Sequence, residues 1–275
     1  MKRIAVIFDL DETIGYFGDV AVFIEAYEKY RNKNGNISDE ELFIIFNTIP
    51  DLFRKGIFDI FRLLRNFKKN NNDKKNKDDK LRVLIYTNNM GPKTWVYSIK
   101  RYIEEKIEYK LFDRVITAWK VDGVKYEEKR TSHDKKYEDL IKISEELKNY
   151  NICFLDDQIH PEMKHEKIEY LRLIPYKYKL TDDEFMNKFL NSKLMKDADD
   201  KKKFKEFCET HFQKKFNIID KVPDKKPKMD KPEKLFKEIK EFVKAPEDKV
   251  EETKEKPKKT RRKRRRRRKK RTKRR

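Results

Sequence analysis

Residues 3–16 read RIAVIFDLDETIGY and place an apolar run directly before two aspartates, Asp9 and Asp11. The run is rich in β-branched residues and is bounded by polar positions, which is typical of a buried strand. Two carboxylates at the end of such a strand have two interpretations: a polar strand end followed by a helix cap, or a metal-binding nucleophile. Features farther along the chain are needed to choose between them.

Further apolar runs follow at a spacing that leaves room for helices. The run LRVLIYTNN covers residues 81–89, NICFLDDQ covers 151–158, and YLRLIPY at 170–176 predicts another strand. Strands that alternate with helices predict an α/β fold with a central parallel sheet covered by helices. The intervening apolar residues have helical spacing from Ile57 to Leu64, from Trp95 to Ile103 and from Tyr137 to Leu147.

Composition divides the chain into four parts. The segment 68–80, KKNNNDKKNKDDK, has no apolar residue and predicts a solvated loop inserted in the first part. Shorter helices around 20–31 and 39–47 are too few to form a large substrate-covering domain. The first part is an α/β domain over 1–180, and the second is a helical extension over 181–216 with helices near 181–192 and 199–216. The third is a Lys/Pro/Glu-rich linker over 217–257 with a short helix at Leu235–Val243. The fourth is an Arg/Lys-rich tail over 258–275.

The basic charge is concentrated in the tail. The chain has 275 residues and a formal net charge of +22, and residues 258–275 contain 16 Lys or Arg and no acid. Subtracting these leaves only +6 for residues 1–257. A run of this kind repels itself and cannot bury apolar surface, so we expect it to stay disordered until it meets a polyanion. Nucleic acid, an anionic membrane or an acidic protein would each serve as its partner.

Cysteine use and hydropathy narrow the class of protein. Cys153 and Cys208 lack C-x-x-C spacing, which argues against a disulfide framework and a cysteine-based zinc site and fits a reducing compartment. The apolar run before Asp9 is too short for a signal peptide. No stretch approaches membrane-spanning length, so we expect an intracellular protein that is not secreted and has no membrane span.

Polar residues end each of the three main predicted strands. Asp9 and Asp11 follow the first, Thr87, Asn88 and Asn89 end the second, and Asp156 and Asp157 end the third. The carboxyl ends of parallel strands meet at one edge of a sheet, where ligands bind. Carboxylates gathered there would repel each other unless a cation joined them, and oxygen ligands of this kind suit Mg²⁺. Lys135 and Lys136, at the start of the helix before the third strand, would help to hold a phosphate.

This order of motifs resembles the haloacid dehalogenase (HAD) superfamily of phosphotransferases. Asp9, Asp11 and Thr13 match its D-x-D-x-T pattern, Thr87 matches the Thr or Ser that ends the second strand, and Asp156-Asp157 matches the acidic pair. The required lysine also precedes the third strand. The resemblance covers roughly residues 1–178 and implies a three-layer Rossmann-like fold with a minimal cap.

Within the superfamily, the chain resembles the branch of phosphatases of the RNA polymerase II carboxyl-terminal domain, also described as NLI-interacting-factor-like. The stretch from Asp9 to Ile14 matches its D-L-D-E-T-L start, and residues 54–61 match its R-P-G-x-x-x-F-L helix start. Lys55 replaces the usual Pro, and Asp157 stands where the branch often has Asn. DDQIHPEM and YTNNMGPKTW look most like divergent members of this branch found in large DNA viruses.

The resemblance implies a role for each site residue. Asp9 would be the nucleophile that forms an aspartyl-phosphate, and Asp11 the general acid and then base. Asp9, the backbone carbonyl of Asp11, Asp156 and Asp157 would hold Mg²⁺. Thr13, Asn88 and Asn89 would contact substrate, and Thr87 would donate to a phosphoryl oxygen. Lys135 would neutralise phosphate charge, with Lys136 nearly as good a candidate and Lys129 a third.

Other polar and aromatic residues near these motifs have ordinary structural interpretations. His133 and His160 flank the motifs and could reach a substrate, but a lone histidine in a loop is usually a surface or hydrogen-bonding residue. Trp95 and Trp119 are expected in the core rather than as substrate platforms.

Three functions remain open on the sequence. A short cap leaves an open site and favours a macromolecular substrate, so the first is a Mg²⁺-dependent phosphatase acting on phosphoserine or phosphothreonine in a phosphoprotein. The second is a polynucleotide end phosphatase whose tail holds the nucleic acid. The third is a nucleic-acid-binding protein that uses an inactive phosphatase scaffold. The Arg-rich tail suggests the nucleus, a viral factory or a virion as the location.

Overall fold

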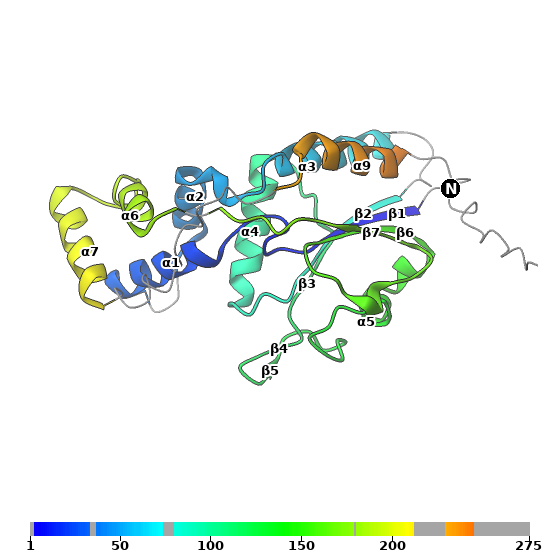
Figure 1. The fold of residues 1–275 in the computed structure, drawn as a ribbon, viewed down its shortest axis with the longest axis horizontal. Coiled ribbons are helices and arrows are strands. Elements are labelled where there is room, and N and C mark those ends of the chain that lie inside the picture. Colours follow the sequence, from blue (N-terminus) through cyan, green and yellow to red (C-terminus); the bar gives the residue numbers. More distant parts are fainter. Residues whose placement is uncertain (1–2, 34–36, 74–79, 179, 212–228, 245–275) are drawn as a thin grey trace, which may run out of the picture.

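The fold is built on a five-stranded, all-parallel sheet with strand order β3-β2-β1-β6-β7 (Figure 1). The computed structural model describes residues 3–33, 37–73, 80–178, 180–211 and 229–244. The α/β fold with a parallel sheet flanked by helices is therefore confirmed. The strands are β1 (Arg3–Phe8), β2 (Lys80–Tyr86), β3 (Arg114–Ile116), β6 (Asn151–Asp156) and β7 (Ile168–Arg172), and β4 (Lys120–Val121) and β5 (Val124–Lys125) form a separate antiparallel hairpin.

Helices cover both faces of the sheet because successive side chains of a strand point to opposite faces. In β1, Ile4, Val6 and Phe8 belong to the larger hydrophobic cluster, whereas Ala5 and Ile7 belong to the smaller one. The larger cluster includes α3 (Ile57–Asp73), α4 (Lys93–Lys106) and α9 (Pro232–Lys244), and the smaller includes α5 (Tyr137–Ile143) and the 3₁₀ helix η2 (Glu145–Asn149). Two further 3₁₀ helices are η1 (Pro50–Leu52) and η3 (Pro161–Met163).

Four helices form a lobe beside the sheet: α1 (Gly18–Tyr30), α2 (Asp39–Thr48), α6 (Asp182–Leu190) and α7 (Ala198–His211) (Figure 1). Aromatic residues join them, with the Phe23 ring stacked 5.2 Å from that of Phe185. Arg31 pairs with Asp200 at 2.5 Å and fixes the end of α1 against α7. The two short helices predicted near 20–31 and 39–47 thus pack with α6 and α7 in one lobe. The sequence predicted helices in the regions of α6 and α7 but not where they pack.

The predicted solvated loop over 68–80 is wrong for its first part. Helix α3 continues to Asp73, residues 74–79 lie outside the described part, and Lys80, the last residue of the predicted loop, already begins β2. Lys68 donates to the Leu111 carbonyl at 2.7 Å and pairs with Asp113 at 2.6 Å. The buried first turns of α3 nucleate the helix. Each further Lys or Asn can then be added at a small cost in free energy, because nucleation is the unfavourable step.

Three other local predictions differ from the structure. The edge strand β3 was not predicted, because three residues give too short a pattern to recognise. The helix expected from Tyr137 to Leu147 ends at Ile143, and a 3₁₀ turn follows Ser144. Helix α7 is described only to His211, so its predicted end at 216 lies outside the described residues. Residues 217–228 and 245–257 of the predicted linker and the predicted tail over 258–275 also lie outside them.

The short helix predicted at Leu235–Val243 is present within α9 and is docked on the sheet domain. Leu235, Ile239 and Val243 are all buried in the larger hydrophobic cluster. Figure 1 shows α9 beside α3 on the same face of the sheet, in agreement with the contacts between these helices. At the start of α3, Gly56 has φ of +79°, and a Cβ there would lie 2.7 Å from Pro232. Glycine therefore permits both the turn and the close approach of α9.

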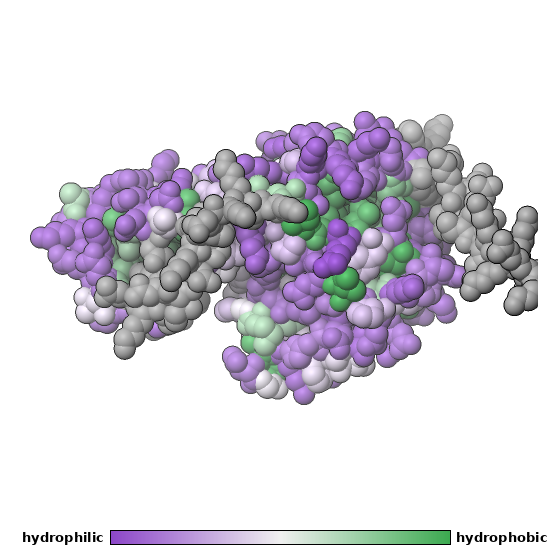
Figure 2. All heavy atoms as spheres, viewed as in Figure 1, coloured by the Kyte–Doolittle hydropathy of each residue, from purple (hydrophilic) through white to green (hydrophobic). Residues whose placement is uncertain are grey.

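The molecular surface is highly charged, as the composition requires. Figure 2 shows mainly hydrophilic residues on the face presented, with hydrophobic residues in small separate patches. In the described part of the chain, no helix combines the length and apolar character needed to cross a membrane. Cys153 and Cys208 are buried free thiols.

Candidate active site at the carboxyl edge of the sheet

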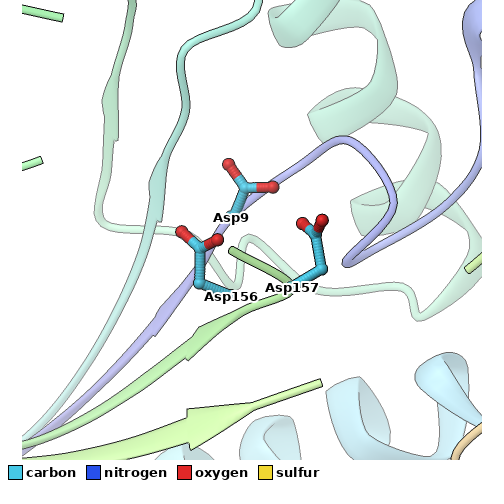
Figure 3. A group of neighbouring side chains, drawn as sticks. All are labelled: Asp9, Asp156 and Asp157. Carbon is cyan, nitrogen blue, oxygen red and sulfur yellow. The ribbon is translucent and has the colours of Figure 1, made fainter. Parts of the chain in front are cut away.

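Three aspartates meet where β1 and β6 end. Asp9 follows β1 and donates its backbone N–H to the Leu155 carbonyl of β6 at 2.9 Å. Asp156 ends β6 and Asp157 follows it. Each of the three offers a carboxylate oxygen within 4.8 Å of the others, and all three residues are at most 6% exposed. Figure 3 shows the three carboxylates gathered on the same side of these strand ends.

Lys135 bridges two of these carboxylates. Its ammonium group donates to Asp9 and, at 2.7 Å, to Asp156, and the residue is only 1% exposed. Burial disfavours the positive charge, but the attraction of Asp9 and Asp156 outweighs it and raises the pKa of Lys135. Lys135 is therefore held as a cation inside the site.

The other two lysines proposed from the sequence lie elsewhere. Lys136 pairs with Glu162 at 3.0 Å, and Lys129 is exposed. The assignment of Lys136 as a near-equal candidate is therefore not supported by its position. Lys136 precedes the first turn of α5 with extended backbone, so the side chains of two consecutive residues point in different directions.

The site carries an excess of negative charge. Lys135 contacts the carboxylates of Asp9 and Asp156, and its charge also acts on those of Asp11 and Asp157. Burial raises the pKa of Asp9 to about 7, an effect that Lys135 opposes and Asp156 reinforces. Burial also raises the pKa of Asp11 and of Asp157. Because a cation of higher charge would relieve this repulsion, the oxygen-only donor set fits a hard divalent ion.

Asp156 differs from its neighbours because hydrogen-bond donors surround it. Burial alone would raise its pKa, but a hydrogen bond from His160 and the charge of Lys135 outweigh burial and lower it. The His160 Nε2 atom lies 3.3 Å from the carboxylate, and the Gln158 backbone N–H donates to it at 2.8 Å. His160 therefore reaches the site as a partner of Asp156, whereas His133 is exposed and forms a T-shaped ring contact with Trp119.

The loop after β1 is held in a tight conformation. Glu12 has φ of +56°, and its N–H donates to the Gly15 carbonyl at 2.7 Å. The Thr13 hydroxyl donates to Asp157 at 3.2 Å and accepts from the Asp157 N–H at 3.1 Å. Because its hydroxyl both donates to and accepts from Asp157, Thr13 joins the two acidic motifs rather than facing a substrate.

Arg54 fixes this loop from the other side. Its guanidinium donates to the carbonyls of Glu12 and Thr13, each at 2.6 Å, and pairs with Asp230 at 3.1 Å. Asp230 also accepts from the Ile174 N–H at 2.8 Å. The segment that leads into α9 therefore supports the loop that carries Asp9 and Asp11, a connection that the helix-start motif at 54–61 did not reveal.

The residues after β2 complete the edge. The Asn89 side chain donates to Asp11 at 2.9 Å, and its backbone N–H donates to the Thr87 hydroxyl, also at 2.9 Å. Thr87 is buried, whereas Asn89 is partly exposed. The structure thus brings Asn89 together with Asp11 and uses it to orient that carboxylate.

Arg130 holds the same segment in place, and it was not among the site residues predicted from the sequence. It is 1% exposed and donates to the carbonyls of Thr87 at 3.1 Å and Thr117 at 2.8 Å and to the Asn88 side chain at 2.7 Å. Its guanidinium also lies 4.9 Å from the centre of the Tyr86 ring. Asn88 is thus occupied by Arg130. No local signal separates this arginine from the many basic residues around it.

Trp95 packs against the larger hydrophobic cluster as expected, whereas Trp119, which was also expected in the core, belongs to neither cluster. Trp95 is partly exposed, with its ring centre 6.1 Å from that of Phe17 and 5.8 Å from that of Phe46. Trp119 is also partly exposed and lies under Lys120. Neither side chain is fully buried.

Comparison with family models, with curated proteins and with solved structures gave no match to this chain. The fold and the site define an α/β protein with a buried aspartate cluster at the carboxyl edge of a parallel sheet.

Proposed function

We propose that the chain is a HAD-type phosphatase, a Mg²⁺-dependent phosphomonoester hydrolase that works through an aspartyl-phosphate. The observation that carries the proposal is the cluster of Asp9, Asp156 and Asp157 around the buried ammonium of Lys135. Asp11 stands two residues from Asp9, as nucleophile and proton donor should on one loop. A structural strand end would not need four acids and a buried lysine, because burying unpaired charge is costly.

In the first step, a carboxylate oxygen of Asp9 attacks phosphorus, and the bond from phosphorus to the leaving oxygen breaks. Asp11 gives its proton to that oxygen. The raised pKa of Asp11, caused mainly by burial, favours the protonated form that this step needs, and Asn89 orients the carboxyl. In the second step, Asp11 takes a proton from water, whose oxygen attacks phosphorus and releases Asp9 and phosphate.

The remaining residues bind and orient the phosphoryl group. Lys135 would neutralise its charge, and Thr87 would donate its hydroxyl proton to a phosphoryl oxygen while accepting from Asn89. Asp9, Asp156, Asp157 and the carbonyl of Asp11 would hold Mg²⁺, which when bound neutralises charge between the carboxylates and the phosphoryl oxygens. Arg130 and Arg54 would keep the two loops in place.

The proposal is tested by phosphate release from phosphoserine and phosphothreonine peptides in the presence of Mg²⁺. Asp9→Asn is expected to abolish turnover, because the amide cannot form the acyl phosphate. Asp122→Asn is a matched control, since Asp122 is exposed in the β4–β5 hairpin and its φ of +48° suits asparagine. Phosphate release that survives Asp9→Asn would refute the mechanism.

Other substrates and a DNA-binding measurement separate the two alternative functions. Turnover of a 3′- or 5′-phosphorylated oligonucleotide that is lost on removal of residues 258–275 would identify a polynucleotide end phosphatase instead. Binding of DNA at physiological salt, without hydrolysis of any phosphoester in Mg²⁺, would identify an inactive scaffold.

A further inference from the structure

A pocket adjoins the candidate general acid on the side of the helical lobe. It has a volume of about 400 Å³ and lies between α1, the start of α2, the segment after β2 and the first turns of α4. This volume is within the range of ~300–1,000 Å³ typical of small-ligand sites. Asp11 and Asn89 line the pocket and also belong to the active site. The pocket is therefore continuous with the position at which a leaving group would depart.

The apolar part of the lining is aromatic and aliphatic. Phe17, Ile24, Leu42 and Trp95 contribute to it. Trp95 is held by its ring contacts with Phe17 and Phe46, yet it stays partly exposed. A held, partly exposed indole offers a flat apolar surface at low entropic cost, as binding sites commonly do.

The charged part of the lining is acidic. Glu25 and Glu28 on α1 line the pocket together with Asp11, and no Lys, Arg or His is among the lining residues of the described chain. Glu25 pairs with Lys29, which is exposed outside the lining, and Glu28 accepts from the Ile37 N–H at 3.2 Å. The carboxylates of Glu25 and Glu28, in a partly apolar pocket, attract a cationic group and repel a polyanion.

We propose that this pocket binds the residues that flank the phosphorylated side chain in a protein substrate, with an apolar side chain against Trp95 and a basic side chain near Glu25 and Glu28. The inference rests on the proposed function, because it is the proton transfer from Asp11 that places the leaving group beside the pocket. The acidic lining favours a basic phosphopeptide and disfavours a nucleic acid end, whose neighbouring phosphates would face the same carboxyls.

The test is a binding titration that needs no turnover. Asp9→Asn blocks the reaction and Trp119→Phe leaves Trp95 as the single tryptophan, so its fluorescence reports on the pocket. The probes are the phosphoserine peptides Ala-Lys-Phe-pSer-Phe-Lys-Ala and Ala-Glu-Phe-pSer-Phe-Glu-Ala. We expect the basic peptide to change the emission of Trp95 and to bind about tenfold more tightly, a difference of about 1.4 kcal/mol.

Substitution of the acidic residues should remove this preference. The double variant Glu25→Gln, Glu28→Gln is expected to bind both peptides within about twofold of each other, since the charge contribution is lost. Glu40→Gln is the matched control, because Glu40 is an exposed helical acid outside the lining and should leave the tenfold preference intact.

Several outcomes would overturn the inference. These are equal binding of the two peptides, binding of phosphoethanolamine as tight as that of the basic peptide, and a change in Trp95 emission caused by a 3′-phosphorylated oligonucleotide. Phosphate release without the charge preference would overturn the peptide pocket and leave the hydrolase. The charge preference without phosphate release would keep the pocket and overturn the hydrolase.

Discussion

Lys135 and Lys136 are adjacent in sequence but differ completely in environment. Lys135 is buried between Asp9 and Asp156, whereas Lys136 pairs with Glu162 in a partly exposed position. We predict that Lys135→Met lowers kcat for phosphopeptide hydrolysis by about 100-fold or more, since a preorganised charge at the phosphoryl group is lost. Lys136→Met should stay within about twofold of the wild type, because surface pairs contribute little. Equal losses in the two variants would contradict the assignment of Lys135.

Some site residues can be recognised from their place in the sequence, and others only from their burial in the folded protein. Asp9, Thr87 and Asp156 could be predicted because each ends an apolar run, and a parallel sheet brings strand ends together. The lysine and Arg130 could not be assigned in this way. Lysine and arginine are abundant throughout the chain, so only tertiary burial distinguishes a site residue from a solvated one.

The ion pair between α1 and α7 gives the lobe a defined pH dependence. Hydrogen bonds from Arg31 hold the pKa of Asp200 well below its ordinary value. A lowered folded-state pKa means that the stabilisation is complete above the unfolded-state pKa of about 4, weakens as the pH falls below that value, and is lost only as the pH falls through the folded-state pKa. We predict that Asp200→Asn lowers the free energy of unfolding by about 1–2 kcal/mol at pH 7.

Urea denaturation at pH 7 and at pH 3 checks this prediction, and the difference between wild type and Asp200→Asn should shrink at the lower pH. Asp199→Asn is the control, because its pair with Lys203 is exposed and should contribute less than about 0.5 kcal/mol. A loss of the same size at both pH values would show that the carboxylate charge is not involved.

Helix α9 is predicted to be part of the folded core rather than an appendage. Ile239 is fully buried against the larger hydrophobic cluster, whereas Lys240 on the next position is exposed. Ile239→Ala should therefore lower the free energy of unfolding by about 2–4 kcal/mol, and Lys240→Ala by less than about 0.5 kcal/mol. A single cooperative transition in urea would accompany this loss, whereas an unchanged midpoint would mean that α9 is not docked in solution.

The elements differ in how far the sequence determined them. Helical periodicity predicted α3, α4, α6 and α9, because each has one apolar face. It did not predict where α6 and α9 pack, since an apolar face specifies burial and not a partner. The strand β3 and the last turns of α3 were missed because tertiary contacts, such as those of Lys68, stabilise segments whose local pattern is weak.

At the scale of the whole molecule, we predict that Mg²⁺ stabilises the fold. A ligand that binds only the folded state at 100 times its Kd raises the free energy of unfolding by about 2.7 kcal/mol, so the melting temperature should rise with Mg²⁺ and fall in EDTA. The double variant Asp156→Asn, Asp157→Asn should lose this dependence, while Asp122→Asn keeps it. A melting temperature that does not respond to Mg²⁺ in the wild type would argue against a magnesium site.

The contact of Arg54 with Asp230 also has a consequence for synthesis of the protein. A protein is synthesised from its amino terminus, which emerges from the ribosome first. Asp9 and Asp11 therefore leave the exit tunnel long before Asp230 has been translated. Arg54 then has only part of its final set of partners, and the face of α3 that α9 covers is still open to solvent. The nascent chain thus carries Asp9, the proposed nucleophile, in an incompletely supported loop until Asp230 has also left the exit tunnel.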